Sequence, residues 1–264
     1  EVEGFIQDEE VVLGARDLLQ AMVFLHETMG SAHLNISPEN VFSAGGRWKL
    51  GGMAFLSAFG GGEEKSWGVE GSDNTRGLKT ENSPATDTRF EVPTKAAPNF
   101  LFSSPLLFSN PGPACDLYSF FLTLHCVFAG RGGGAPVLAK RVDSPVEARR
   151  LASSLLGPQH QAFLAPLPAT LRTAASATLN SRRNTPTAAR ALLRHPFFDD
   201  PTSRALEAAE LMPARPPAEQ KEFLAAAGRL ATAVGRGGGA RRLAAAVGKL
   251  TNPALAPLVR GVQL

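Results

Sequence analysis

The pattern of hydrophobic and polar positions predicts a chain built mainly from α-helices. The first helix is predicted over residues 11–29, where apolar residues recur every three to four positions and Gly30 follows as a C-cap. A strongly apolar helix is predicted over 114–129, and we expect it to be buried at the centre of the fold. Shorter helices are predicted over 144–156, 159–165, 170–179 and 186–193.

Two segments interrupt the helical pattern. Val41-Phe42 and Trp48-Lys49-Leu50 are β-prone and flank a glycine-containing turn, which predicts a β-hairpin. From 60 to 98 the chain is polar, rich in Gly, Ser, Thr and Asn, and without periodicity. We therefore expect a long, largely disordered surface loop there.

The chain changes character after residue 200. Segments rich in Ala, Leu and Arg predict helices over 202–212, 218–234 and 240–250. Short helices separated by short breaks are typical of an α-solenoid. We therefore divide the chain into a first part, residues 1–200, and a helical extension, residues 201–264, in which such an array begins.

Composition and charge exclude several classes of protein. Hydrophobic residues make up 44% and charged residues 19%, which is ordinary for a globular protein. The net charge is only +3, too small a surplus over this length for a nucleic-acid-binding surface. No apolar run approaches the ~20 residues of a membrane helix, and the acidic start is no secretory signal. We expect protein partners, no nucleic acid and no transmembrane segment.

The two cysteines and the basic residues near the C-terminus receive structural interpretations. Cys115 and Cys126 lie on one predicted helix, ~16 Å apart at ~1.5 Å per residue, too far for a disulfide. Free thiols favour a reducing compartment. Arg241 and Arg242, with Arg236 and Lys249, are expected on a solvated helix face; a basic face for acidic lipids or a partner is the alternative.

The most informative motifs lie between residues 33 and 54. A polar loop leads into the hairpin, and the hairpin leads into Gly52-Met53-Ala54. The loop reads His33-Leu34-Asn35-Ile36-Ser37-Pro38-Glu39-Asn40. This order resembles the catalytic loop H-R-D-L-K-P-E-N and the metal-binding loop D-F-G of a protein kinase.

Further segments match the same pattern in order. Pro105 lies where the activation segment of a kinase closes, and Asp116-Leu117-Tyr118-Ser119 resembles the start of the central kinase helix. Arg183 and His195-Pro196-Phe197-Phe198 resemble the last helices of the large lobe. The resemblance implies structural roles for Pro105, Asp116 and Arg183. It implies that Asp116 accepts backbone N–H groups of the loop, and that His33 braces this loop.

The departures from the kinase pattern concern the groups that carry the chemistry. Asn35 replaces the aspartate that accepts a proton from the substrate, and Ser37 replaces the lysine beside the transferred phosphoryl group. Gly52 replaces the metal-binding aspartate, and Asn40 alone cannot hold Mg²⁺. We therefore expect no catalytic, cofactor-binding or metal-binding residue, and neither ATP nor Mg²⁺ as a cofactor.

The details are most similar to the SCY-like pseudokinase family, and within it to the branch associated with clathrin-coated vesicles. Trp48-Lys49 precedes the degenerate metal loop, and Pro196-Phe197-Phe198-Asp199-Asp200 closes the kinase-like region. The resemblance implies a kinase large lobe followed by HEAT-type helices. We expect the chain to lack the small lobe, because no glycine-rich phosphate loop precedes residue 11.

The resemblance implies a catalytically inactive scaffold for clathrin or adaptor coat components. We expect such a scaffold in the cytoplasm, on vesicles between Golgi and endosomes, with peripheral membrane association open. Two alternatives stay open. One is a residual kinase that binds ATP and transfers phosphate slowly, and the other is a truncated, non-functional fragment that exposes apolar surface.

Overall fold

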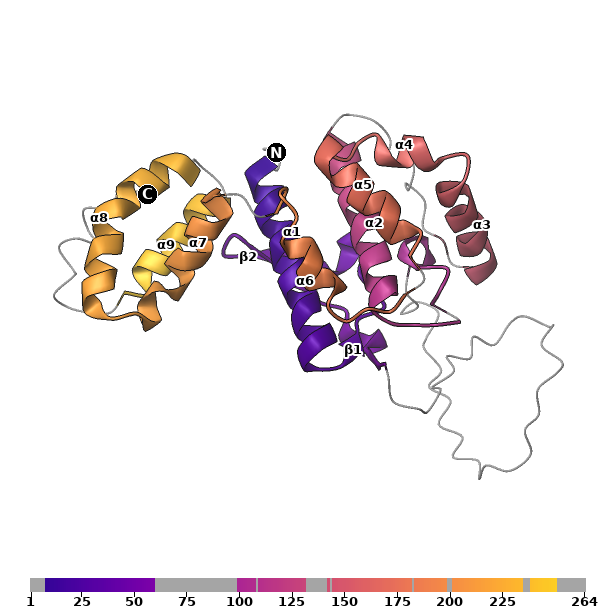
Figure 1. The fold of residues 1–264 in the computed structure, drawn as a ribbon, viewed down its shortest axis with the longest axis horizontal. Coiled ribbons are helices and arrows are strands. Elements are labelled where there is room, and N and C mark those ends of the chain that lie inside the picture. The colour runs from indigo at the N-terminus through magenta and orange to yellow at the C-terminus, as the bar shows by residue number, and fades with distance from the viewer. Residues whose placement is uncertain are drawn as a thin grey trace, which may run out of the picture.

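The structure, a computed structural model, is mainly helical, with a few short strands (Figure 1). It describes residues 8–59, 99–107, 109–131, 142, 144–181, 183–198, 201–234 and 238–250. The loop predicted over 60–98 lies outside the described residues, as do residues 251–264 of the helical extension.

The first predicted helix is confirmed and ends in an unusual turn. Helix α1 (Asp8–Val23) continues directly into η1 (Phe24–Thr28), a π-helix. The face of α1 with Val11, Leu18 and Met22 is buried in the main core, as the 3.6-residue period requires. Single π-turns are rare and shift the register of the side chains that follow. Here the shift affects His26, which is buried.

The predicted hairpin is confirmed and lies against α1. Strand β2 (Val41–Ala44) pairs antiparallel with β3 (Arg47–Leu50), and Val41 opposes Leu50. The Trp48 ring lies directly on Gly14 of α1, where an added Cβ would come within 2.1 Å of Trp48 Cδ2. Any larger residue at position 14 would therefore push the hairpin off the helix.

A second, very short pair of strands lies at the start of the 33–40 loop. Strand β1 (Ser31–Ala32) pairs antiparallel with β4 (Ser57–Ala58), with Ala32 opposite Ser57. Between the hairpin and β4 lies the 3₁₀ turn η3 (Met53–Phe55). The pairing brings the segment after the hairpin back beside the segment before the loop.

The central helix is α2 (Pro113–Arg131), and the prediction that it is buried is confirmed. Its residues from Leu117 to Leu124 include six large hydrophobic side chains, all buried: Leu117, Tyr118, Phe120, Phe121, Leu122 and Leu124. Four helices complete this part, as predicted from the sequence: α3 (Pro145–Leu156), α4 (His160–Leu164), α5 (Ala169–Leu179) and α6 (Ala188–Leu193).

The helical extension contains the three predicted helices, and they have a core of their own. These are α7 (Pro201–Leu211), α8 (Pro217–Val234) and α9 (Gly238–Gly248), with the 3₁₀ turn η6 (Met212–Ala214) after α7. Figure 1 shows them as a group beside α1, on the side opposite α2. Leu13 of α1 joins their core, which includes Leu206, Leu224 and Leu243. Helix α1 thus contributes to both cores.

None of the described helices is long and apolar enough to cross a membrane.

Candidate functional site

The candidate site is the 33–54 segment, and it is attached to the core through one carboxylate. Asp116, in the first turn of α2, is completely buried. Its Oδ1 accepts the backbone N–H of Leu34 at 2.7 Å, and its Oδ2 accepts that of His33 at 2.7 Å. The Nε2 of His26 donates to Oδ2 at 2.8 Å. Three donors supply the hydrogen bonds that a buried carboxylate needs in place of water.

His26 is a site residue that the sequence analysis missed. Its ring is fully buried, and the π-turn η1 directs it toward Asp116. The Nε2 of this ring bonds to Asp116, and the other ring nitrogen, Nδ1, has no partner within the described part of the chain. A histidine on the apolar face of the predicted 11–29 helix was the available signal, because a buried ring needs a polar partner.

His33 serves as a brace because both of its ring nitrogens are engaged. Nε2 donates to the carbonyl of Gly51 at 2.8 Å, and Nδ1 accepts the backbone N–H of Asn35 at 3.2 Å. Burial lowers the pKa of His33, and this outweighs the opposing effects of Asp116 and the Gly51 bond. A neutral ring with both nitrogens engaged has no free nitrogen with which to accept a proton from a substrate.

The backbone of the loop is held in a conformation that its sequence does not favour. Leu34 has φ of 60°, in the left-handed region that side chains other than glycine rarely adopt. Such a residue costs about 1–3 kcal/mol and persists only where its surroundings hold it. Asp116 accepts the N–H of Leu34, and the Leu34 side chain packs with Ala32, Phe55 and Cys115.

The amide side chains of the loop are used internally. Asn40 Nδ2 donates to the carbonyl of Asn35 at 2.9 Å and to the Ser37 hydroxyl at 3.2 Å. Asn35 Nδ2 lies 3.4 Å from the carbonyl of Gly52. Ser37 is buried. The Asn40 side chain therefore bonds within the 33–40 loop, and the Asn35 side chain links this loop to Gly52.

The metal-loop positions offer no side-chain ligand. Gly52 precedes η3 with φ of 72°, and Met53 and Ala54 follow with exposed side chains. A Cβ added to Gly52 would lie 2.6 Å from Asn40 Cγ. The Asn40 side chain thus fills the space into which a residue larger than glycine would extend.

The donor set of this segment does not fit a magnesium-bound nucleotide. Mg²⁺ prefers carboxylate oxygens, and the one carboxylate of the segment, Glu39, accepts from Asn99 Nδ2 at 3.4 Å. The amide groups of Asn35 and Asn40 are hydrogen-bonded within the segment. The nearby Asp116 carboxylate is buried and already accepts three hydrogen bonds. Among the described residues, no three His, Cys, Asp or Glu side chains come together as metal ligands would.

Two further predicted residues, Pro105 and Arg183, lie away from the loop. Pro105 begins a turn after Ser104, whose hydroxyl accepts the N–H of Leu106 at 3.1 Å. Arg183 is exposed. Its neighbour Asn184 makes the contacts instead, as its Oδ1 accepts the Ala114 N–H at 3.0 Å at the start of α2.

Asn184 makes further contacts with the segment before α2. Its Nδ2 donates to the carbonyl of Asn110 at 3.0 Å, which ties the segment before α2 to the segment before α6. A Cβ on Gly112 would lie 2.5 Å from Asn184 Cγ. The sequence does not indicate this contact, because Gly112 and Asn184 lie far apart along the chain.

Comparisons of the chain with models of protein families, with curated proteins and with solved structures found no match.

Proposed function

We propose that the protein is a catalytically inactive, protein-kinase-like scaffold. The observation that carries the proposal is the bonding of the 33–54 segment. Asn35 and Gly52 stand where a kinase carries its catalytic and metal-binding aspartates, while His33, Asn40 and Asp116 brace the backbone around them. Asn35, Ser37 and Gly52 lack the charges that phosphoryl transfer requires, and this supports a binding function over a catalytic one.

The chemistry of the replaced side chains supports the same conclusion. Phosphoryl transfer depends on positioned charges that stabilise the phosphates and accept the proton of the attacking hydroxyl. Asn35 carries an amide, which does not accept a proton at neutral pH. Gly52 offers no ligand, and Asn40 obstructs a larger side chain at its position.

The partners we propose are protein components of clathrin or adaptor coats, in the cytoplasm and on vesicles between Golgi and endosomes. This part follows from the resemblance to SCY-like pseudokinases. Two exposed apolar side chains, Phe42 at 56% and Met53 at 45%, are the contact points that we propose for a protein partner.

The catalytic half of the proposal is tested by thermal unfolding with ATP, with and without Mg²⁺, and by a phosphoryl-transfer assay. We expect no change in Tm with ATP or Mg²⁺, and no phosphoryl transfer. A ligand at about 100 times its Kd adds about 2.7 kcal/mol, which raises Tm by a few degrees. A Mg²⁺-dependent shift with measurable turnover would establish the residual kinase instead. Absence of a cooperative transition would favour the non-functional fragment.

The scaffold half is tested by direct binding of purified clathrin and purified adaptor complexes to the immobilised chain. Phe42→Ser is the test variant and Val146→Ser its matched control, because Val146 is also strongly exposed, at 61%, but lies on α3. We expect binding that Phe42→Ser weakens at least tenfold and Val146→Ser leaves unchanged. Failure of every coat component to bind would reject the coat assignment.

A further inference from the structure

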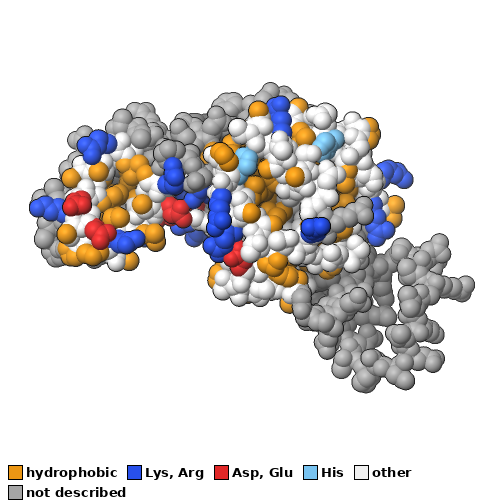
Figure 2. Space-filling model, viewed as in Figure 1, with side chains coloured by type: hydrophobic (Ala, Val, Ile, Leu, Met, Phe, Trp, Pro, Cys, Tyr) orange, Lys and Arg blue, Asp and Glu red, His pale blue; other side chains and the backbone are white. Residues whose placement is uncertain are grey.

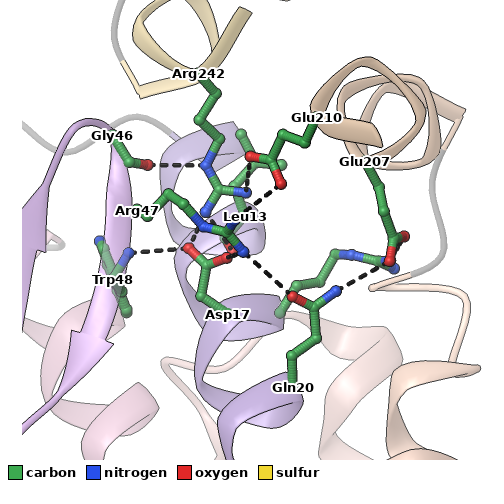
Figure 3. Close-up of polar contacts among 10 residues, drawn as sticks. Leu13, Asp17, Gln20, Gly46, Arg47, Trp48, Glu207, Glu210 and Arg242 are labelled. Atoms are coloured by element: carbon green, nitrogen blue, oxygen red, sulfur yellow. Dashed lines mark hydrogen bonds and ion pairs between the residues drawn. The ribbon is translucent and has the colours of Figure 1, made fainter. Parts of the chain in front are cut away.

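A cluster of charged side chains joins the helical extension to the first part of the chain (Figure 3). It contains three carboxylates and three guanidinium groups, contributed by α1, the hairpin, α7 and α9: Asp17, Glu207, Glu210, Arg16, Arg47 and Arg242. Figure 2 shows side chains of both charges at this junction. The charges are balanced, and the members range from the buried Asp17 and Arg242 to Arg47 and Glu207, whose side chains are partly exposed.

Asp17 of α1 is the centre of the cluster. It is buried, and its Oδ2 accepts the backbone N–H of Trp48 at 2.9 Å. Its Oδ1 accepts Arg47 Nη2 at 3.1 Å, and its Oδ2 also forms an ion pair with Arg242. One carboxylate thus holds the β3 backbone of the hairpin and an arginine of α9 at the same time.

Arg242 is buried, which corrects the expectation that it lies on a solvated face or a basic binding face. Its side chain is only 6% exposed, whereas that of its neighbour Arg241 is 57% exposed. Its Nε donates to the carbonyl of Gly46 in the hairpin turn at 2.9 Å, and its Nη2 donates to the carbonyl of Leu13 at 3.4 Å. Arg242 therefore connects α9 to both the hairpin turn and α1.

The ion pair between Arg242 and Asp17 is buried, unlike an ordinary surface ion pair. Burial, reinforced by the nearby Arg16, lowers the pKa of Arg242 to about 10. The guanidinium therefore still carries its charge at neutral pH. Removing one partner of such a buried pair leaves the other charge uncompensated, which is strongly destabilising.

The hairpin carries this restraint on to the candidate site. Strand β3 runs from Arg47 and Trp48, which bond to Asp17, to Leu50. The next residue, Gly51, donates its N–H to the carbonyl of Asn40 at 2.8 Å and accepts His33 Nε2. Hydrogen bonds and one strand thus link Arg242 to the braced loop without interruption.

We propose that α9, through Arg242, holds the β2–β3 hairpin in the position that keeps the 33–52 loop braced. The helical extension then controls the surface that the loop presents, and a partner that displaces α9 would loosen it. Coupling between distant sites requires an element that both sites influence, and the hairpin is that element here. The inference concerns conformation, so it holds whether or not coat proteins are the partners.

The test is amide hydrogen exchange of the full chain with Arg242→Met, which keeps most of the side-chain volume and removes the charge. Arg241→Met is the matched control, because Arg241 lies on the same helix and makes an exposed ion pair with Glu10 at 2.9 Å. We expect exchange in peptides covering 31–40 and 47–52 to rise at least tenfold in Arg242→Met and less than twofold in Arg241→Met. Exchange reports the free energy of local opening.

A rise confined to α9 and the hairpin turn at 45–46, with 31–40 unchanged, would overturn the proposal. Peptides from α5 serve as the internal standard, because α5 belongs to the core around α2. If Arg242→Met accelerates α5 as well, the milder Glu210→Gln replaces it. That variant removes the negative charge that faces Arg242, whose Nη1 lies 4.0 Å from Glu210 Oε1, as well as Arg47, and the same criterion applies.

Discussion

Asp116 and Asp17 are both buried aspartates, and they are satisfied in different ways. Asp116 accepts two backbone N–H groups and one imidazole, with no Lys or Arg partner among the described residues. Asp17 accepts one backbone N–H and pairs with two arginines. The first anchors a loop to the central helix, and the second joins two parts of the chain.

The difference shows two routes by which a carboxylate can be kept out of water. Hydrogen-bond donors replace the hydration of Asp116, and each donor must be correctly placed for the buried charge to be stable. Opposite charges compensate Asp17, and the pairing tolerates some displacement because Coulomb attraction falls slowly with distance. Asp116 therefore specifies a local geometry, whereas Asp17 specifies which elements meet.

The largest effect is expected when the donors around Asp116 lose their acceptor. Asp116→Ala leaves the N–H groups of His33 and Leu34 and the Nε2 of His26 buried without a partner. Each unsatisfied group costs about 1–3 kcal/mol, so we expect the free energy of unfolding to fall by about 4 kcal/mol or more. Urea unfolding measures this change.

Thr123→Val is the control for Asp116→Ala. Thr123 is also buried on α2, and its hydroxyl donates to the carbonyl of Ser119 at 2.9 Å. The carbonyl retains its helical environment, so we expect a loss of about 1 kcal/mol. Equal losses for the two variants would show that Asp116 contributes no more than an ordinary buried polar group.

A smaller loss is expected when Asp17 is neutralised. Asp17→Asn keeps the shape of the side chain, and its oxygen still accepts the Trp48 N–H, but the charge facing Arg47 and Arg242 is removed. Arg47 and Arg242 retain Glu210 and backbone carbonyls as partners. We therefore expect the free energy of unfolding to fall by about 2–3 kcal/mol. Urea unfolding with the isosteric variant measures the loss, and a value below 0.5 kcal/mol would mean that the cluster is only a surface contact.

Sequence reasoning predicted the Asp116 site better than the Asp17 cluster, and the reason is physical. The helices and the hairpin follow from local periodicity, and Asp116 belongs to an ordered set of motifs. Asp17 and Arg242 are 225 positions apart, and no local pattern indicates that an arginine on an amphipathic helix will be buried. The π-turn that directs His26 is likewise set by packing and not by local propensity.

A third prediction separates the two regions by pH. The pKa of His33 is lowered from 6.5 by burial, so the unfolded chain takes up a proton first as pH falls. The contribution of His33 is complete above pH 6.5 and decreases below it, by at most about 1.4 kcal/mol per pH unit. The pKa of Glu210 is raised from 4.5, chiefly by burial, so its contribution is complete below pH 4.5 and decreases as pH rises through the raised pKa.

Two variants distinguish these opposite slopes. His33→Gln keeps a donor for the Gly51 carbonyl and removes the titration, so we expect stability to fall less between pH 7 and pH 5.5 than in the natural chain. Glu210→Gln removes the other titration, so stability between pH 4.5 and pH 7 should rise more steeply. Urea unfolding across this range measures both slopes, and parallel curves for all three proteins would contradict the assignment.

The smallest effect is expected at the exposed neighbour of Arg242. Arg241→Met removes an ion pair with Glu10 whose arginine is 57% exposed, and exposed pairs contribute about 0–1 kcal/mol. Raising the ionic strength from 0.1 M to 1 M shortens the Debye length from about 10 Å to about 3 Å, so the loss should vanish in high salt. Arg242→Met should keep most of its loss in 1 M salt, because salt does not enter the buried cluster.

Urea unfolding of the two variants at both ionic strengths provides the comparison. A salt-sensitive Arg242→Met would mean that water reaches Asp17, and that the seam between the helical extension and the hairpin is open in solution.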